Sequence, residues 1–417
     1  MKFYKRISVY LLFVSSLIIG FVFHENSSGG GKLDYGYVIP FIENFSIDFN
    51  NGFQNYVEKK ISLIHSPVFY IIASFILKFT NSLLIVKLLY LLVCTFLPFV
   101  FFKILKEKNN FDSQIIFYFS LIIFFSPYYR SSAIWLLGDN LSLIFFGLSI
   151  FYFLKFENKK KIKDLYLSII FLILCCYIRY YYCLFFIYYL IFIIKNLDLK
   201  VLFNVFILSL ILSLPAFIYF FYVIINYQFF KTLSSFGDIN YIRSSLIILS
   251  ILLFYLFPFI IDKKLSIIRY YKENYKIFLL IISLFIFIYF LDSFLSLNLI
   301  SFPSQKGGGV FIKLSNLYNI EPKILLFFLS IVSILILDFL FKNDRFNNYL
   351  LLIILILSLP FFAIYQKYLD PLFFLLFFGL VKSNYLEKII NDKSINLIFI
   401  FTYFSSFYIF SLIYYLK

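Results

Sequence analysis

The sequence predicts an all-α, polytopic integral membrane protein. Of its 417 residues, 63% are hydrophobic and only 14% are charged, whereas about a quarter of the residues in a soluble domain carry charge. Apolar runs recur along the whole chain, and many approach the ~20 residues that a helix needs to cross a bilayer. Because hydrocarbon offers the backbone no hydrogen-bond partner, each of these runs is expected to be a helix.

About thirteen transmembrane helices are expected from the length of the apolar runs, with the N-terminus in the cytoplasm. They lie near residues 7–23, 83–102, 113–126, 140–155, 165–178, 181–194, 201–224, 246–261, 277–293, 324–341, 349–365, 371–381 and 395–415. The first run resembles a signal peptide, but no cleavage site of small residues follows it, so we expect an uncleaved first helix.

The basic residues orient these helices. Most of the 37 Lys and Arg residues fall in connectors that this arrangement places in the cytoplasm, such as 103–110, 155–164, 262–276 and 382–393. The net charge of +16 could otherwise suggest a nucleic-acid partner. We expect no nucleic-acid binding, because cations in short connectors orient helices more often than they bind a polyanion.

The same orientation predicts a large first extracytoplasmic loop at residues 24–65. The stretch that follows, 66–79, cannot also cross the membrane, because a second crossing there would invert the orientation of everything downstream. At ~1.5 Å per residue it spans only about 20 Å, so we expect an interfacial helix.

Unusual residues collect on the predicted outer side. The glycine runs at 29–31 and 307–309 are expected to be hinges or turns that approach a ligand closely, or else simply flexible loops. Arg179 interrupts an apolar run, CCYIRYYYC, and needs a partner or a path to the surface. The four cysteines lie in apolar segments without metal-ligand spacing, so neither a disulfide nor a metal site is expected.

Several segments in order resemble the GT-C superfamily, the integral-membrane glycosyltransferases that use polyprenyl-phosphate-linked sugars. They are the acidic ENSSGGGKLDY at 25–35, HSPVFY at 65–70, SPYYRSSAIWLLGDN at 126–140 and QKYLDP at 366–371. The resemblance is strongest over residues 1–200, and 201–417 would form the variable C-terminal helices of one domain, 1–417. HSPVFY has Ser where Pro is usual, QKY has Lys where Arg is usual, and GDN is not the acidic pair of metal-dependent members.

The resemblance implies transfer of a sugar from a polyprenyl-phosphate donor to a glycan, lipid or protein acceptor on the extracytoplasmic face. Composition typical of an A+T-rich bacterium points to undecaprenyl phosphate and the plasma (inner) membrane. The expected chemistry is direct displacement with inversion, in which a carboxylate takes the proton of the acceptor hydroxyl.

The candidate catalytic carboxylates are Asp34, Glu25 and Asp139. Asp34 is preferred because YGY follows it and its rings could stack on a sugar, and Glu25 is the alternative base. Both are otherwise ordinary solvated loop carboxylates. Asp139 would orient the acceptor or the base, or would cap the helix that it precedes.

Substrate binding is expected from aromatic and basic side chains on the outer side. The candidates are Tyr35, His65, Arg130, Arg179, Arg243, Lys367 and Tyr368. The cations among them would hold the phosphate, with Arg as the better bidentate ligand, or else snorkel to the interface. No cofactor is expected, and the two histidines lack the spacing of a metal site, so a divalent ion is possible but unsupported.

Three other functions fit parts of the pattern. A transporter or lipid flippase needs charged residues at mid-helix, broken helices or related halves, and the sequence has no internal repeat. An O-antigen-type polymerase would also use lipid-linked sugars outside, but with arginines in later loops. A non-catalytic membrane subunit fits if neither Asp34 nor Glu25 matters.

Overall fold

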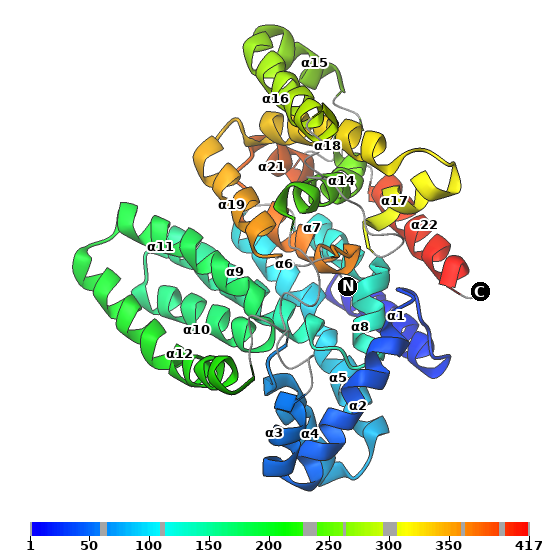
Figure 1. Cartoon of the computed structure of the whole chain (residues 1–417), viewed down its shortest axis with the longest axis vertical. Coiled ribbons are helices and arrows are strands. Elements are labelled where there is room, and N and C mark those ends of the chain that lie inside the picture. Colours follow the sequence, from blue (N-terminus) through cyan, green and yellow to red (C-terminus); the bar gives the residue numbers. More distant parts are fainter. Residues whose placement is uncertain are drawn as a thin grey trace. The chain divides into compact units, whose positions relative to one another are not determined.

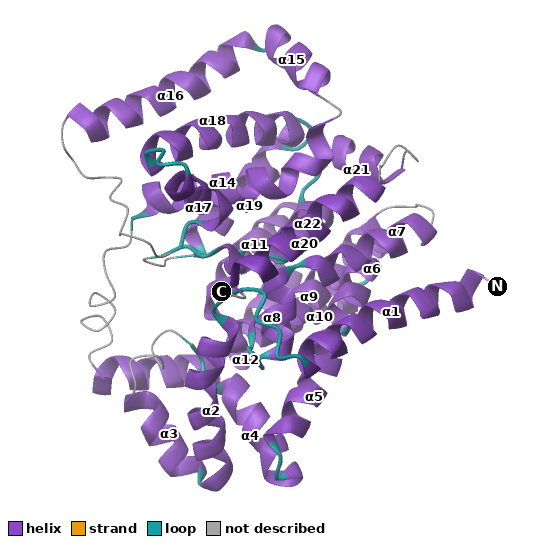
Figure 2. Cartoon of the chain, turned by 90° about the vertical axis from the view of Figure 1, so that its right-hand side faces the viewer, coloured by secondary structure: helices purple, strands orange, loops and turns teal. Residues whose placement is uncertain are grey.

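The structure is a computed structural model that describes residues 2–58, 65–108, 113–227, 240–261, 264–294, 307–359, 363–391 and 397–415. Over these ranges the chain forms helices and no strands (Figure 2). The predicted all-α class is therefore confirmed for the part of the chain that is described.

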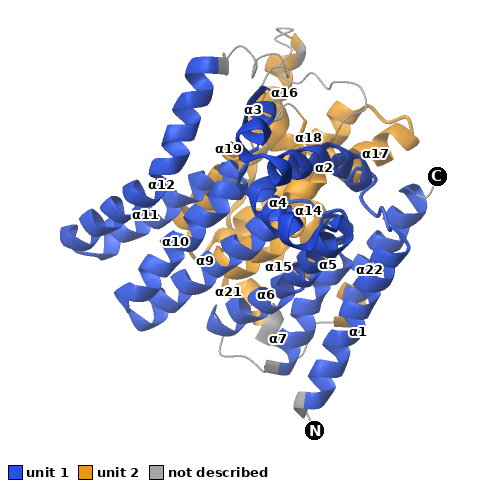
Figure 3. Ribbon diagram, turned by 90° about the horizontal axis from the view of Figure 1, so that it is seen from below, with its two compact units in different colours: residues 1–236, 401–417 blue, residues 237–400 orange. Residues whose placement is uncertain are grey.

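The chain divides into two compact units (Figure 3). Unit 1 contains Met1–Phe236 together with Phe401–Lys417, and unit 2 contains Gly237–Ile400. The single domain over 1–417 stays a prediction.

Unit 1 holds the segments that carry most of the predicted site (Figure 1). Its helices are α1 (Lys2–Val22), α2 (Gly31–Ile47), α3 (Phe49–Glu58), α4 (Val68–Thr80), α5 (Leu83–Cys94), α6 (Phe96–Lys108), α7 (Ser113–Ser120), η2 (Leu121–Phe125), α8 (Pro127–Ile134), α9 (Asp139–Lys159), α10 (Ile162–Ile178), η3 (Tyr180–Leu184), α11 (Phe185–Asn196), α12 (Leu199–Tyr227) and most of α22 (Leu397–Tyr415).

Unit 2 is built around α14 (Tyr241–Ile260), which is buried over most of its length. Helices α17, α18 and α19 pack against it. The other elements of the unit, with the bounds of these three, are α15 (Lys264–Glu273), α16 (Tyr275–Phe294), α17 (Gly309–Leu317), α18 (Pro322–Phe341), α19 (Arg345–Leu357), η5 (Gln366–Tyr368), α20 (Leu372–Leu375), η6 (Leu376–Leu380) and α21 (Asn384–Asn391).

Eight helices within the described ranges are long and apolar enough to cross a membrane. They are Tyr4–Val22, Leu83–Lys108, Asp139–Lys159, Leu199–Asn226, Tyr241–Ile260, Tyr275–Asp292, Pro322–Phe341 and Leu397–Tyr415. Each coincides with a predicted crossing, so this is an integral membrane protein. The other five predicted crossings fall on shorter elements, namely α7 with η2, α10, η3 with α11, α19, and α20 with η6, and the total of thirteen stays a prediction.

The α9–α10 pair forms a hairpin whose two ends are each closed by an ion pair (Figure 1). The chain leaves α9 through Lys160, which adopts the left-handed conformation at φ 55°. Lys155 and Asp164 pair at 3.0 Å beside this turn, whereas Asp139 and Arg179 pair at 2.8 Å at the far end. These contacts join the two helices at each end and fix the register of the hairpin.

The segment predicted as the first outer loop is helical, with α2 and α3 covering most of its described residues. Helix α4 then spans 13 residues and ends at Asn81, which is left-handed at φ 50°. It buries Phe69 and Tyr70 while Phe75 and Phe79 stay exposed. A helix of this length covers only about 20 Å, less than the ~30 Å of a hydrocarbon core; its interfacial position stays a prediction.

Candidate functional site

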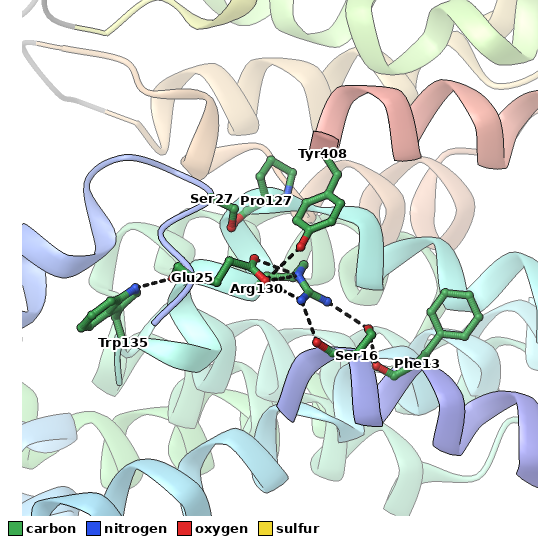
Figure 4. Close-up of polar contacts among 8 residues, drawn as sticks. All are labelled: Phe13, Ser16, Glu25, Ser27, Pro127, Arg130, Trp135 and Tyr408. Carbon is green, nitrogen blue, oxygen red and sulfur yellow. Dashed lines mark hydrogen bonds and ion pairs between the residues drawn. The ribbon is translucent and has the colours of Figure 1, made fainter. Parts of the chain in front are cut away.

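Arg130 and Glu25, both predicted as site residues, form a buried ion pair with each other (Figure 4). Ser126 caps α8 by accepting from the Tyr129 N–H at 2.9 Å, which places Arg130 in the first turns of this short helix. The Arg130 Nε donates to both carboxylate oxygens of Glu25, at 2.9 and 3.1 Å, and Nη2 donates to Oε2 at 2.5 Å. Both side chains are more than nine-tenths buried.

Further hydrogen bonds hold both side chains of this ion pair in place. Arg130 donates to the hydroxyl and the backbone carbonyl of Ser16 in α1, at 3.2 and 3.0 Å. Tyr408 in α22 donates to Glu25 Oε2 at 2.9 Å, and its ring lies 4.8 Å from the guanidinium carbon. Burial lowers the pKa of Arg130, but its hydrogen bonds to Glu25 and the charges of Glu25, Tyr408 and Tyr129 together raise it by more, so the cation is retained. This arrangement favours a structural role for Glu25 and Arg130 over their predicted roles as base and phosphate ligand.

The glycine run at 29–31 packs closely against its neighbours. Ser27 and Ser28 donate to the Pro127 carbonyl and the Ser131 hydroxyl, at 2.8 and 2.7 Å. A Cβ at Gly31 would collide with Ser131, and one at Gly29, where φ is 74°, would collide with the ring of Tyr415. Close packing against side chains of α22 and α8 therefore accounts for Gly29 and Gly31, whereas nothing lies within 4 Å of a Cβ at Gly30.

Lys87, which the sequence did not single out, lies in a box of three aromatic rings. Its Nζ is 5.1 Å from the centre of Phe21, 4.7 Å from Tyr35 and 4.8 Å from Trp135. The side chain is only 7% exposed. Cation–π contacts of this kind are worth about 0.5 to 2 kcal/mol each, so they offset only part of the cost of burying an ammonium group.

No carboxylate or other acceptor pairs with Lys87 among the residues that the structure describes. An ammonium group has three donors, and here the described surroundings offer it only aromatic faces. A buried cation with this environment is suited to receive an anion from outside the chain.

Asp34 is next in sequence to Tyr35, one wall of the aromatic box around Lys87. Tyr35 supplies one wall and contacts Trp135 with ring centres 5.7 Å apart, and Asp34 precedes it in the first turn of α2. Asp34 is half-buried. Asp34 therefore lies at the start of α2, next in sequence to a ring that contacts Lys87, which itself belongs to α5.

A second pair of predicted residues meets nearby in unit 1. Asp139, in the first turn of α9, accepts from Arg179 Nε at 2.8 Å. Gly138 before it lies so close to Phe69 that an added Cβ would be 3.0 Å from that ring. The segment 65–70 and the segment around Asp139 are therefore neighbours in the fold.

The charges of three predicted site residues affect the pKa of the Tyr70 phenol. Burial raises its pKa, the charge of Arg179 lowers it, and the charges of Asp139 and Asp34 raise it. Tyr70 ends the HSPVFY segment, but the sequence analysis named only His65 from it. His65 contributes through its backbone, whose carbonyl accepts from the Tyr56 hydroxyl at 2.5 Å.

Three predicted site residues, Arg243, Lys367 and Tyr368, belong to unit 2. Arg243 is buried in the first turn of α14, and its N–H is capped by the Asn240 side chain at 3.0 Å. Lys367 lies over the rings of Tyr365 and Tyr368, 5.6 and 5.8 Å from their centres. Their predicted role in phosphate binding stays a prediction.

The second glycine run holds the segment that contains Lys367. Gly307, Gly308 and Gly309 all have positive φ. The Gly308 N–H donates to the Ile364 carbonyl at 2.7 Å, and the Val310 N–H donates to Gln366 Oε1 at 3.1 Å. A Cβ at Gly307 would lie 2.8 Å from the Ile364 carbonyl oxygen, so this glycine allows close packing of backbone against backbone.

Comparison with known proteins brings no relative: no protein family, no curated protein and no solved structure matches the chain.

The described ranges contain no cluster of side chains that could hold a metal ion. Among those residues, no group of three or more His, Cys, Asp or Glu side chains stands where it could hold an ion. Among the described residues, the groups that could serve a reaction here include the half-buried carboxylate of Asp34, the buried ammonium group of Lys87 and the rings of Tyr35 and Trp135 that contact it.

Proposed function

We propose that this protein is a membrane glycosyltransferase that moves a sugar from a polyprenyl-phosphate-linked donor to an acceptor hydroxyl. The observation that carries the proposal is the Lys87 ammonium inside its aromatic box, one wall of which, Tyr35, directly follows the half-buried Asp34 in α2. One cation for the phosphate and one carboxylate for the hydroxyl proton are the minimum that this reaction needs.

Lys87 would hold the phosphate of the donor. It lies near the start of the candidate span Leu83–Lys108, which is where the headgroup of a lipid substrate would be met. The aromatic walls exclude water, so the attraction between the ammonium and a phosphate oxygen would be stronger than on an open surface. Trp135 and Tyr35 offer flat faces on which the sugar of the donor could stack.

Asp34 would act as the base. Its carboxylate takes the proton of the acceptor hydroxyl while the acceptor oxygen forms a bond to the anomeric carbon. The bond from that carbon to the phosphate oxygen breaks, and the electron pair leaves with the polyprenyl phosphate, whose added charge Lys87 stabilises. A single displacement of this kind inverts the anomeric configuration.

Asp139 and Arg179 would shape the acceptor side of the site. The charges of Asp139, Arg179 and Asp34 all act on the Tyr70 phenol, and Gly138, which precedes Asp139, packs against the neighbouring Phe69, which supports a site that these residues share. Because Arg179 already holds Asp139, we assign the pair to orientation of the acceptor rather than to phosphate binding.

The reaction would take place on the extracytoplasmic face. Asp139 begins α9 and Lys159 ends it, and 21 residues of helix separate these ends by about 31 Å. The lysines of residues 155–163 lie at the second end, and basic residues favour the cytoplasm. In a bacterium the membrane would be the plasma membrane and the carrier undecaprenyl phosphate.

Transfer of radiolabel from polyprenyl-phosphate sugars in membranes tests this function. Asp34→Asn should abolish transfer at an unchanged protein level, because the carboxamide cannot take the proton. Glu43→Gln is the matched control, since Glu43 is an exposed carboxylate on the same helix, and it should retain full transfer.

Equal transfer by wild type and Asp34→Asn would remove the assignment of the base. If instead labelled lipid crosses the bilayer without any transfer of sugar, the protein is a transporter rather than a glycosyltransferase. Growth of the label into long chains would favour a polymerase.

A further inference from the structure

The C-terminal helix α22 contacts the segment that leads into the proposed site. Tyr408 donates to the Glu25 carboxylate at 2.9 Å, and Ser411 donates to the Ser27 carbonyl at 2.6 Å. The ring of Tyr415 covers Gly29. These three residues recur at helical spacing, so one face of α22 rests on residues 25–29.

Glu25 connects this contact to the aromatic box. Its side chain is held by Arg130 and Tyr408, while its backbone carbonyl accepts from the indole Nε1 of Trp135 at 2.7 Å (Figure 4). The position of the Trp135 ring is therefore set by a residue whose other end is fixed by α22.

Trp135 is one of the three walls around Lys87. The attraction between a cation and a ring depends on the cation staying over the face, within about 6 Å of its centre. A change in the tilt or distance of this ring would weaken the box and admit water to the ammonium group.

We infer that Tyr408 is a positioning residue for the anion site, acting through Glu25 and Trp135 on Lys87. The inference rests on the proposed function only in taking a lipid phosphate as the anion. The contacts run from Tyr408 to Glu25, from Glu25 to Trp135 and from Trp135 to Lys87, at 2.9, 2.7 and 4.8 Å.

The test uses the fluorescence of Trp135, which is the single tryptophan of the chain. Tyr408→Phe removes the hydroxyl but keeps the ring over Arg130. Tyr414→Phe makes the same chemical change at an exposed position of the same helix. Emission and anisotropy are first measured on purified full-length protein without ligand, and undecaprenyl phosphate is then titrated in the same detergent.

The expected result is a shifted emission and a lower anisotropy for Tyr408→Phe, with both unchanged for Tyr414→Phe. The dissociation constant for undecaprenyl phosphate should rise by about 2- to 30-fold in Tyr408→Phe, as is usual for coupling through intermediate residues. Glu25→Gln, where it folds, should shift the emission in the same direction.

Wild-type emission in Tyr408→Phe would overturn the inference, as would a shifted emission with unchanged affinity. The spectra measured without ligand test whether Tyr408 positions Trp135, and they do so independently of the proposed function. If wild type binds no undecaprenyl phosphate, the proposed function fails, while the spectra still decide whether Tyr408 positions Trp135.

Discussion

Asp139 and Arg179 form an ion pair, Oδ1 to Nε at 2.8 Å, at the end of the α9–α10 hairpin that lies away from its lysine-rich turn. Their side chains are 25% and 11% exposed. The two residues come from separate segments of the sequence, and their pairing brings a predicted acid and a predicted cation into one place.

This pair should show strong energetic coupling. A double-mutant cycle with Asp139→Asn and Arg179→Gln, read from the free energy of unfolding in detergent, should give about 0.5 to 3 kcal/mol. In the control cycle, Glu43→Gln with Arg179→Gln, the two effects should add to within about 0.5 kcal/mol. Additivity in both cycles would mean that the ion pair does not stabilise the hairpin.

The buried pair of Glu25 and Arg130 should be far more sensitive to loss of one partner. Glu25→Gln leaves a buried guanidinium without its counter-charge, so the free energy of unfolding should fall by about 3 to 5 kcal/mol. Thermal unfolding in detergent measures this change. Glu43→Gln, at an exposed position, should change it by no more than about 0.5 kcal/mol, and an equally small effect of Glu25→Gln would contradict the structural role.

Two glycines of α2 should respond in opposite ways to alanine. At Gly31 the new Cβ would collide with Ser131 and lie 2.9 Å from Trp135, so Gly31→Ala should destabilise by about 1 to 3 kcal/mol. At Gly36 nothing lies within 4 Å, and Gly36→Ala should stabilise the helix by roughly 0.5 to 1 kcal/mol. Thermal unfolding of the two variants in parallel checks this, and the same sign for both would be inconsistent with the packing of Gly31 on α8.

The orientation in the membrane is open to thiol labelling. In a chain whose four native cysteines are replaced by alanine, we expect Asn51→Cys to react with a membrane-impermeant maleimide added to intact cells. Lys161→Cys should react only after the membrane is broken. Both residues are exposed, so accessibility is matched, and labelling of both from the same side would invert the proposed topology.

The fold class could be predicted from the sequence because the bilayer imposes it directly. A run such as residues 83–102 has one physical solution, a helix, and the structure has a helix from Leu83 to Lys108 at that place. The helices of residues 31–58 could be expected only in general terms, because polar residues and glycines interrupt them and they lack the continuous apolar run of a crossing helix.

Only part of the site could be predicted from the sequence, because several of its contacts join residues that are far apart in the chain. Asp139 and Arg179 stood out as charges in apolar surroundings, and the structure pairs them. Lys87 resembled an ordinary lysine near the end of a crossing helix, because its three rings come from distant segments. Likewise, nothing local indicated that Tyr408 would meet Glu25, which is 383 residues away in sequence.

The most direct test of the account is equilibrium binding of radiolabelled undecaprenyl phosphate to the purified protein. Lys87→Gln removes the charge at similar size, and because hydrogen bonds to charged groups are worth about 1.5 to 3 kcal/mol, binding should weaken by about 10- to 150-fold. Lys103→Gln, which alters a lysine over a single ring in α6, should bind as wild type does. Unchanged binding by Lys87→Gln would contradict the account, because the boxed ammonium would then have no anion to hold.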